Sequence, residues 1–236
     1  MTHLSLENID SFYGTSHILH NVSLEVEEGS LVTLIGRNGV GKTTTLKTVM
    51  GMVEPRAGVI TFDGDRIDGE SSTEISRRGI SLIPEHRRIF SDLTARENIR
   101  MGHLKHETEI DPEKLITDVF DYFPRLEERV NQPAGQMSGG EQQMLAIARA
   151  LVSEPDLLLV DEPTEGLMPE LVGKIKEVLV KINNGGMSIL LVEQNVDLAL
   201  SISDYAYVLD EGIIQTEGPA TEIRNDPEVK TKYLTV

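Results

Sequence analysis

The sequence predicts an α/β protein with a mostly parallel sheet, an antiparallel β region at the N-terminus and an inserted helical region. A glycine-rich loop at residues 36–44 lies between an apolar run suited to a buried strand and a run suited to a helix. From residue 157 onwards, short apolar runs alternate with helical patterns, which is typical of a parallel sheet covered by helices. Residues 4–6 and 22–26 alternate apolar and polar side chains, and this period of two indicates antiparallel strands with one wet face.

The N-terminal part of the chain is expected to consist mainly of strands. The two alternating runs are separated by a loop that contains Tyr13. The glycine-rich loop leads into a helix that is expected over residues 45–50. Further strands are predicted at 31–35, 58–62 and 80–83.

The rest of the chain is divided between a helical insertion and the parallel sheet. We expect one domain of 236 residues, with a core formed by 1–87 and 152–236 and a helical subdomain at 88–151. Helical patterns begin at Asp111-Pro112 and after Ser138. The elements predicted to follow are strands at 157–160, 188–192 and 205–209 and helices at 171–182 and 196–202.

The composition excludes several kinds of partner and site. The formal net charge is −17, so we expect no nucleic acid partner, because phosphate backbones attract basic surfaces. The chain has no cysteine, which excludes disulfides and thiolate metal sites. No apolar run has the length of a membrane span, and the N-terminus lacks a signal-peptide pattern, so a cytoplasmic protein is expected. The acidity fits plain solubility or adaptation to a salty cytoplasm.

The glycine-rich loop predicts nucleotide binding. Residues 36–43 read Gly-x-x-x-x-Gly-Lys-Thr, the phosphate-binding P-loop pattern, in the strand–loop–helix context that this pattern requires. Glycines let successive backbone N–H groups face phosphate oxygens, and the helix start adds its positive dipole end. Lys42 supplies positive charge to the β- and γ-phosphates of ATP, and the Thr43 hydroxyl can ligate Mg²⁺. The predicted nucleotide-binding residues of this loop are Gly36, Asn38, Gly39, Gly41, Lys42, Thr43 and Thr44.

Two adjacent carboxylates, Asp161 and Glu162, follow the apolar run at 157–160. An acidic residue at the mouth of a buried strand is placed to hold Mg²⁺, which is the role predicted for Asp161. Glu162 can then act as the base toward an attacking water. The same pattern alone would also fit a strand that ends in a polar turn, but the P-loop favours the functional interpretation.

A third motif, Ser138-Gly139-Gly140, opens a predicted helix. Ser138 is placed to cap the helix, and the two glycines expose backbone N–H groups that can bind an anion. An ordinary N-cap would need only the serine, whereas the run Met-Ser-Gly-Gly-Glu-Gln-Gln is much more particular.

Across its whole length the sequence resembles the ATP-binding subunits of ABC transporters. Residues 36–44 are similar to Walker A of that family, 157–162 to its Walker B and 137–142 to its Leu-Ser-Gly-Gly-Gln signature. Within the family, the chain looks most like the subunits that serve branched-chain amino acid uptake, and residues 161–166 also look like the related urea-uptake ATPases. The segments that carry the first of these similarities are 84–90, 140–147, 192–195 and Tyr233-Leu234.

The resemblance implies a head-to-tail dimer, formed by two copies of the chain or with a second ATP-binding subunit. Two ATP molecules would lie between the P-loop of one subunit and Ser138, Gly139 and Gly140 of the other. Tyr13 would stack on the adenine. The dimer would dock under membrane permease subunits at the cytoplasmic face of the cell membrane, through the helical subdomain and the loop near Glu85. An external solute-binding protein would deliver the solute.

Three positions depart from the usual family pattern. Glu85, Glu141 and Gln194 stand where glutamine, glutamine and histidine are usual. The resemblance implies catalytic roles for Glu85 and Gln194 beside Glu162, and Glu85 can also reach Mg²⁺ as a charged ligand. The Gln194 amide would donate a neutral hydrogen bond to the γ-phosphate, where a histidine would titrate.

These observations favour an ATPase subunit of an ABC importer that takes up a small polar nutrient, with branched-chain amino acids as the preferred solute. One alternative is an importer of urea or short-chain amides. Another is a non-transport ABC ATPase in translation or DNA repair, although the single cassette and the acidity disfavour it. A nucleotide-binding module without hydrolysis is a third, and the presence of Glu162 argues against it.

Overall fold

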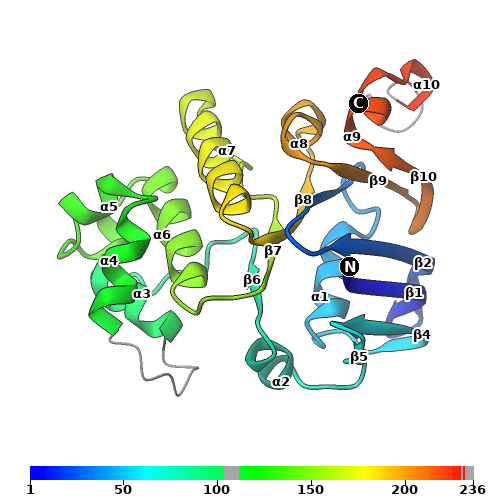
Figure 1. Ribbon diagram of the computed structural model, residues 1–236, viewed down its shortest axis with the longest axis horizontal. Coiled ribbons are helices and arrows are strands. Elements are labelled where there is room, and N and C mark those ends of the chain that lie inside the picture. The colour runs from blue at the N-terminus through cyan, green and yellow to red at the C-terminus, as the bar shows by residue number, and fades with distance from the viewer. Residues whose placement is uncertain (104–111, 230, 232–236) are drawn as a thin grey trace.

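Two sheets and a group of inserted helices make up the computed structural model, which describes residues 1–103, 112–229 and 231 (Figure 1). Asp111, at the predicted start of a helical pattern, and the terminal Tyr233-Leu234 lie outside the described residues. Within the described part of the chain, no helix has both the length and the apolar character needed to cross a membrane.

The smaller sheet is antiparallel and lies at the N-terminal end of the chain. Its strand order is β2-β1-β4-β5, and β1 pairs with both β2 and β4. Tyr13 is the last residue of β1, paired with Ser16 of β2, rather than a loop residue as predicted. Its strands are β1 (Thr2–Tyr13), β2 (Ser16–Glu27), β4 (Pro55–Phe62) and β5 (Asp65–Arg66).

The larger sheet has six strands in the order β10-β9-β3-β8-β7-β6. All neighbouring strands are parallel except β10, which pairs antiparallel with β9. Every residue of β3, β7 and β8 is buried, which explains why these strands read as continuous apolar runs. The strands are β3 (Leu31–Ile35), β6 (Ile80–Ile83), β7 (Leu157–Asp161), β8 (Ser188–Glu193), β9 (Tyr205–Asp210) and β10 (Ile213–Pro219).

Helices cover the sheets and fill the insertion between β6 and β7. The inserted helices are α3 (Ala95–His103), α4 (Pro112–Phe120), α5 (Pro124–Glu128) and α6 (Gly139–Leu151), with a short 3₁₀ turn, η1 (Ala134–Gln136). They form one group at the side of the molecule away from the antiparallel sheet, as Figure 1 shows. The remaining helices are α1 (Lys42–Val49), α2 (Ser72–Arg77), α7 (Pro169–Asn184), α8 (Val196–Ile202), α9 (Ala220–Asn225) and α10 (Pro227–Val229).

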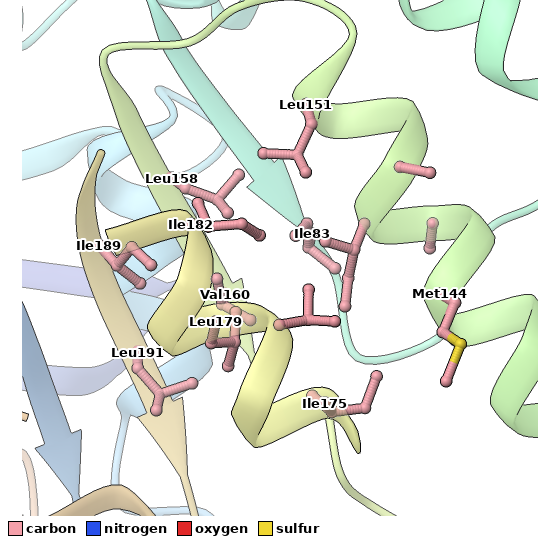
Figure 2. Close-up of a cluster of buried hydrophobic side chains, with 14 of the residues drawn as sticks. Ile83, Met144, Leu151, Leu158, Val160, Ile175, Leu179, Ile182, Ile189 and Leu191 are labelled. Atoms are coloured by element: carbon pink, nitrogen blue, oxygen red, sulfur yellow. The ribbon is translucent and has the colours of Figure 1, made fainter. Parts of the chain in front are cut away.

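Two hydrophobic cores lie on opposite faces of the larger sheet. Alternate residues of each central strand belong to different cores, so Leu157 and Leu159 of β7 pack toward the antiparallel sheet and α1. Leu158 and Val160 pack toward the helices, together with side chains from α6, α7 and β8, as Figure 2 shows. Continuous burial on both faces holds the central strands rigidly, and their ends carry the candidate site.

Candidate active site

The candidate site lies where the carboxyl ends of β3, β7 and β8 meet. The parallel register pairs Ile35 with Glu193 and Asp161 with Val192, so the three strands end at the same edge of the sheet. The P-loop follows β3, Glu162 follows β7 and Gln194 follows β8. Ligands bind at such an edge in open α/β sheets, because the loops that leave it converge there.

The P-loop conformation depends on glycine at two positions. Gly41 is the N-cap of α1 with φ of 115°, a left-handed conformation that L side chains rarely adopt. A Cβ atom at Gly36 would lie 2.2 Å from the carbonyl oxygen of Leu209, closer than any real contact. Asn38 and Gly39 are exposed at the tip of the loop, whereas Thr44 is buried in the first turn of α1. The helix begins at Lys42, three residues earlier than predicted.

Lys42 is buried at the centre of the loop, with 4% of its surface exposed. Its Nζ donates to the carbonyl oxygens of Gly36 and Arg37, both at 3.0 Å. The same nitrogen lies 3.1 Å from Oε1 of Glu162. A buried ammonium group with three acceptors around it places a fixed positive charge inside the loop, where the predicted phosphate oxygens would lie.

Asp161 and Thr43 are joined directly, although Asp161 ends β7 and Thr43 lies in the first turn of α1. The Thr43 hydroxyl donates to Oδ1 of Asp161 at 3.0 Å. Burial raises the pKa of Asp161 to about 6 against the opposing effect of the Thr43 hydrogen bond, and the carboxylates of Glu162 and Glu85 raise it further. The protein therefore holds this carboxyl in surroundings that favour its proton unless a cation is near.

Glu162 is held between a lysine and an amide. Its Oε1 faces Lys42, as described above, and the Gln194 side-chain amide donates to its Oε2. The backbone of Glu162 has φ of 45°, which is uncommon for a residue other than glycine. Its N–H donates to the carbonyl oxygen of Val192 at 2.9 Å, which ties the turn after β7 to β8. The structure thus brings together the predicted base, the P-loop lysine and Gln194.

The signature residues lie on a different part of the molecule. Ser138 caps α6 with a capping box, in which its hydroxyl donates to Oε2 of Glu141 at 2.9 Å and accepts from the Glu141 N–H. A Cβ atom at Gly140 would lie 2.4 Å from Leu171 Cδ1, so glycine is also required for packing against α7. In Figure 1, α6 and α1 lie on opposite sides of β7, so this chain does not bring Ser138 to its own P-loop helix.

Glu141 is ionised by its surroundings, even though it replaces the usual family glutamine. Burial raises its pKa, but hydrogen bonds from Ser138 and the nearby charges of Arg129 and Arg125 outweigh that effect and hold the pKa below its usual range. Arg129 Nε lies 3.3 Å from Glu141 Oε1. The carboxylate therefore acts as a helix-capping group at the start of α6.

Tyr13 and Glu85 stand at the margins of the site. Tyr13 is 47% exposed at the end of β1, next to Gly14, so part of its side chain is accessible to a ligand. Glu85 follows β6 and Pro84, and its Oε1 lies 3.5 Å from Nδ1 of His86. The charge of Glu85 contributes to the raised pKa of Asp161, which shows that the two carboxylates face the same region.

The residues at this edge fit Mg²⁺ bound together with phosphate. Among the residues that the structure describes, no group of three or more histidine, cysteine or carboxylate side chains is arranged to hold a metal. Mg²⁺ is usually held by only one or two protein oxygens, with water and substrate phosphates completing its shell. The Asp161 carboxylate and the Thr43 hydroxyl provide such a pair of hard oxygen ligands.

Sequence reasoning missed several residues that support the site. Glu193 bonds to Thr164 and Asn195, which flank the predicted catalytic pair. Arg149 of α6 donates to the carbonyl oxygens of Arg88 and Arg87, just after Glu85, at 2.8 and 3.1 Å. Glu193 stands directly before Gln194 and within the segment 192–195 that carries the family resemblance, and these are the signals in the sequence that could have drawn attention to it.

A phosphate-binding loop, a buried lysine, a Walker B carboxylate pair and a helix-opening signature on an α/β core define a nucleotide-binding P-loop ATPase. The ABC transporter family model matches residues 19–165, more than half of the chain. The chain belongs to the ABC transporter family, as an ATP-binding domain of the transport-coupled ATPase type.

Three comparisons illustrate the relationship. The high-affinity branched-chain amino acid transport ATP-binding protein BraG of Pseudomonas aeruginosa is 44% identical over 98% of this chain and 99% of its own length. The lipopolysaccharide export system ATP-binding protein LptB of Escherichia coli is 34% identical over 99% of this chain and 98% of its own length. Among solved structures, the dimeric structure of a post-hydrolysis state of the ATP-binding cassette MJ0796, bound to ADP and Pi, matches with a TM-score of 0.82. Its sequence is 27% identical, and the match covers 92% of this chain and 98% of that chain.

Proposed function

We propose that Glu162 is the base in ATP hydrolysis by this chain and that Gln194 senses the γ-phosphate. The observation that supports the proposal most directly is the position of the Glu162 carboxylate, between Lys42 Nζ and the Gln194 amide at the edge of the sheet. A base must lie within reach of the water that it activates, and the groups that bind the γ-phosphate define where that water is. The segments that follow β3, β7 and β8 therefore bring the positive charge of Lys42, the carboxylate of Glu162 and the neutral amide donor of Gln194 to one place.

The other loop residues bind and orient the substrate in this proposal. Lys42 exchanges its contact with Glu162 for phosphate oxygens, which frees the carboxylate to accept a proton from water. Thr43 and Asp161 would hold Mg²⁺, and Glu85 would supply a further carboxylate from the turn after β6. Mg²⁺ bound with ATP neutralises charge on the phosphate oxygens. Tyr13 stacks on the adenine ring.

We further propose that the complete site needs a second subunit. Ser138, Gly139 and Gly140 lie at the start of α6, away from α1 of the same chain (Figure 1). The N–H groups of a helix start attract anions, so the same residues of a partner subunit are suited to close over the γ-phosphate. The similar cassette MJ0796 is dimeric with ADP and Pi, which supports this arrangement. The partner is a second copy or a related ATP-binding subunit.

Permease subunits are the proposed membrane partners, bound at the cytoplasmic face. A groove of about 620 Å³ lies between α2, β6 and the turn after α1 on one side and the inserted helices α3 and α6 of the predicted subdomain at 88–151 on the other. Its described lining includes Arg77, Arg88 and Arg149 but no carboxylate, in a chain whose net charge is −17. The exposed apolar side chains of Met52, Phe90 and Met101 also line it. These features suit a short amphipathic helix with acidic residues.

Branched-chain amino acids are the proposed solutes, because the similarity to BraG extends over nearly the whole of both chains. An external solute-binding protein would deliver them to the permease. Export of lipopolysaccharide is the second candidate function, favoured by the 34% identity to LptB over equally complete lengths. The comparisons lend no support to the urea or amide alternative, and the named relatives are transport proteins rather than ATPases of translation or repair.

The test combines transport with a variant of the proposed base. The chain is reconstituted with its permease subunits in vesicles, and uptake of labelled leucine is measured with ATP. We expect uptake that stops in Glu162→Gln, while ATP binding persists and an ATP-bound dimer accumulates, because removing a general base typically costs about 10²–10⁴-fold in rate. Near-normal turnover in Glu162→Gln would contradict its role as base. ATP hydrolysis without leucine uptake, but with extraction of a lipopolysaccharide, would favour the export function.

A further inference from the structure

Glu193 is a buried carboxylate that the proposed hydrolysis does not use. It is the last residue of β8, and only 2% of its surface is exposed. Its Oε1 accepts hydrogen bonds from the Thr164 backbone N–H at 3.1 Å and the Thr164 hydroxyl at 2.6 Å. Its Oε2 accepts from the backbone N–H of Asn195 at 3.1 Å. A buried carboxyl group with all of these bonds made is a strong local constraint.

The partners of Glu193 flank the two proposed catalytic residues. Thr164 lies two residues after Glu162, and Asn195 directly follows Gln194. Asn195 is also the N-cap of α8, where its Oδ1 accepts from the Leu198 N–H at 3.1 Å. One carboxylate therefore connects the turn after β7 to the turn after β8, and so fixes where Glu162 and Gln194 stand relative to each other.

The turn that carries Glu162 needs such a constraint. The φ of 45° at Glu162 is a conformation that non-glycine residues keep only where the surroundings enforce it. A cavity of about 400 Å³ lies beside the turn, lined by residues that include Glu162, Thr164 and Gln194. The turn thus has room to relax on that side, and the bonds to Glu193 oppose the relaxation.

We propose that Glu193 is a positioning residue for ATP hydrolysis, which holds the turns at Thr164 and Asn195 so that Glu162 and Gln194 converge on the γ-phosphate. The inference rests on the proposed roles of those two residues. A carboxylate is required because both of its oxygens face backbone N–H groups. Burial raises the pKa of Glu193 above its usual range and the nearby charge of Glu162 adds to the rise, while the bonds from Thr164 and Asn195 oppose it.

The hydrogen bonds that Glu193 accepts from Thr164 and Asn195 are called the Glu193 clamp below. Their chemistry predicts that replacing Glu193 with a side chain of the same size lowers turnover strongly. A glutamine at position 193 has one acceptor oxygen and one NH₂ group, so its NH₂ must face either the Thr164 or the Asn195 N–H. One backbone N–H then loses its side-chain acceptor, although the size of the side chain is unchanged. Thr164→Val removes the hydroxyl donor at the other end of the clamp with little change in shape.

The experiment measures kcat, ATP affinity and the free energy of unfolding for Glu193→Gln, Thr164→Val and the double variant of the full chain. We expect kcat to fall by about 10–100-fold, the usual range for residues that orient catalytic groups, with ATP affinity unchanged. The double variant should lose little more than the worse single variant, because both changes break one clamp. Thr164→Ser, which keeps both donors, should recover most of the turnover that Thr164→Val loses.

Asp68→Asn is the matched control. Asp68 also accepts a backbone N–H, from Ile60 at 3.1 Å, and pairs with Arg66, but it lies by the antiparallel sheet. This variant should lower stability without lowering kcat. Unchanged kcat in Glu193→Gln would overturn the proposal, as would a loss of kcat that merely follows lost stability and ATP affinity. Glu162→Gln, measured in parallel, separates the two inferences: if it turns over ATP normally, the assigned base is wrong, whatever Glu193→Gln shows.

Discussion

Replacing Asp161 with asparagine should stabilise the protein at neutral pH but not in acid. Asp161 is 4% exposed, and its pKa is raised from the ordinary value of 3.8 to about 6 by burial and by the carboxylates of Glu162 and Glu85, against the hydrogen bond from Thr43. Between these two values the unfolded chain has lost the proton while the folded protein still holds it. The stability that the protonated Asp161 side chain contributes is therefore fully present below the unfolded-state pKa, and it is lost as the pH rises through the folded-state pKa.

The size of the effect follows from the two pKa values. Ionising Asp161 in the folded protein costs about 3 kcal/mol relative to the unfolded chain at pH 7, but only about half as much at pH 5. Asparagine is neutral throughout, and its Oδ1 can still accept the hydroxyl of Thr43. The gain in unfolding free energy of Asp161→Asn over the wild type should therefore be about 1 kcal/mol larger at pH 7 than at pH 5.

Urea unfolding at several pH values and constant ionic strength, without nucleotide or metal, measures this difference. Asp68→Asn is a control of opposite sign, because the hydrogen bond from Arg66 lowers the pKa of Asp68. The stability that wild-type Asp68 contributes is present at neutral pH and disappears in acid, so that variant should approach the wild type as the pH falls. A gain for Asp161→Asn that stays constant across the range, or that is larger at pH 5 than at pH 7, would refute the reasoning.

The remaining predictions concern the nucleotide site. Lys42→Ala should weaken both ATP binding and turnover, because the buried ammonium group inside the loop is lost; calorimetry that shows unchanged ATP affinity would count against its role. A mixed dimer of Lys42→Ala and Ser138→Arg subunits should regain one intact composite site and part of the hydrolysis, whereas turnover by fully monomeric wild-type protein would exclude a shared site. Gln194→Ala should lower turnover more than ATP binding, since a transition-state contact is lost. Gln194→His should stay partly active and gain a pH dependence around an unperturbed imidazole pKa of about 6.5; equal rates in Gln194→Ala and the wild type would dismiss the assignment.

Patterns between neighbouring residues account for what could be predicted without coordinates. The strand at Leu31–Ile35 and the loop and helix after it were predicted because the apolar run, the glycines and the lysine are adjacent in the chain. The buried strands β7 and β8 were confirmed for the same reason, since burial on both faces leaves a continuous apolar run. The helix α2 was missed, even though Ser71 and Glu74 form a capping box whose Ser-x-x-Glu spacing is visible in the sequence.

Burial, and contacts between residues that are far apart in the sequence, could be determined only from the tertiary structure. Thr43 and Asp161 are 118 residues apart, and Glu162 and Gln194 are 32 apart, yet parallel register brings all four to one edge of the sheet. Glu193 lies in the segment 192–195 that resembles the family, directly after a predicted strand, but no role was predicted for it. Its role emerged only from its burial and its three hydrogen bonds.

Without coordinates, the glycine-rich loop predicted nucleotide binding through a P-loop, because that loop is made from consecutive residues and their backbone N–H groups. Local patterns also predicted which side chains carry charge toward phosphate and metal. The folded chain was needed to show which of those charges face one another, that burial raises the pKa of Asp161 to about 6, and that α6, which Ser138 caps, lies on the other side of β7 from α1. Electrostatic effects depend on distance and burial, and a linear pattern specifies neither until the strands are paired.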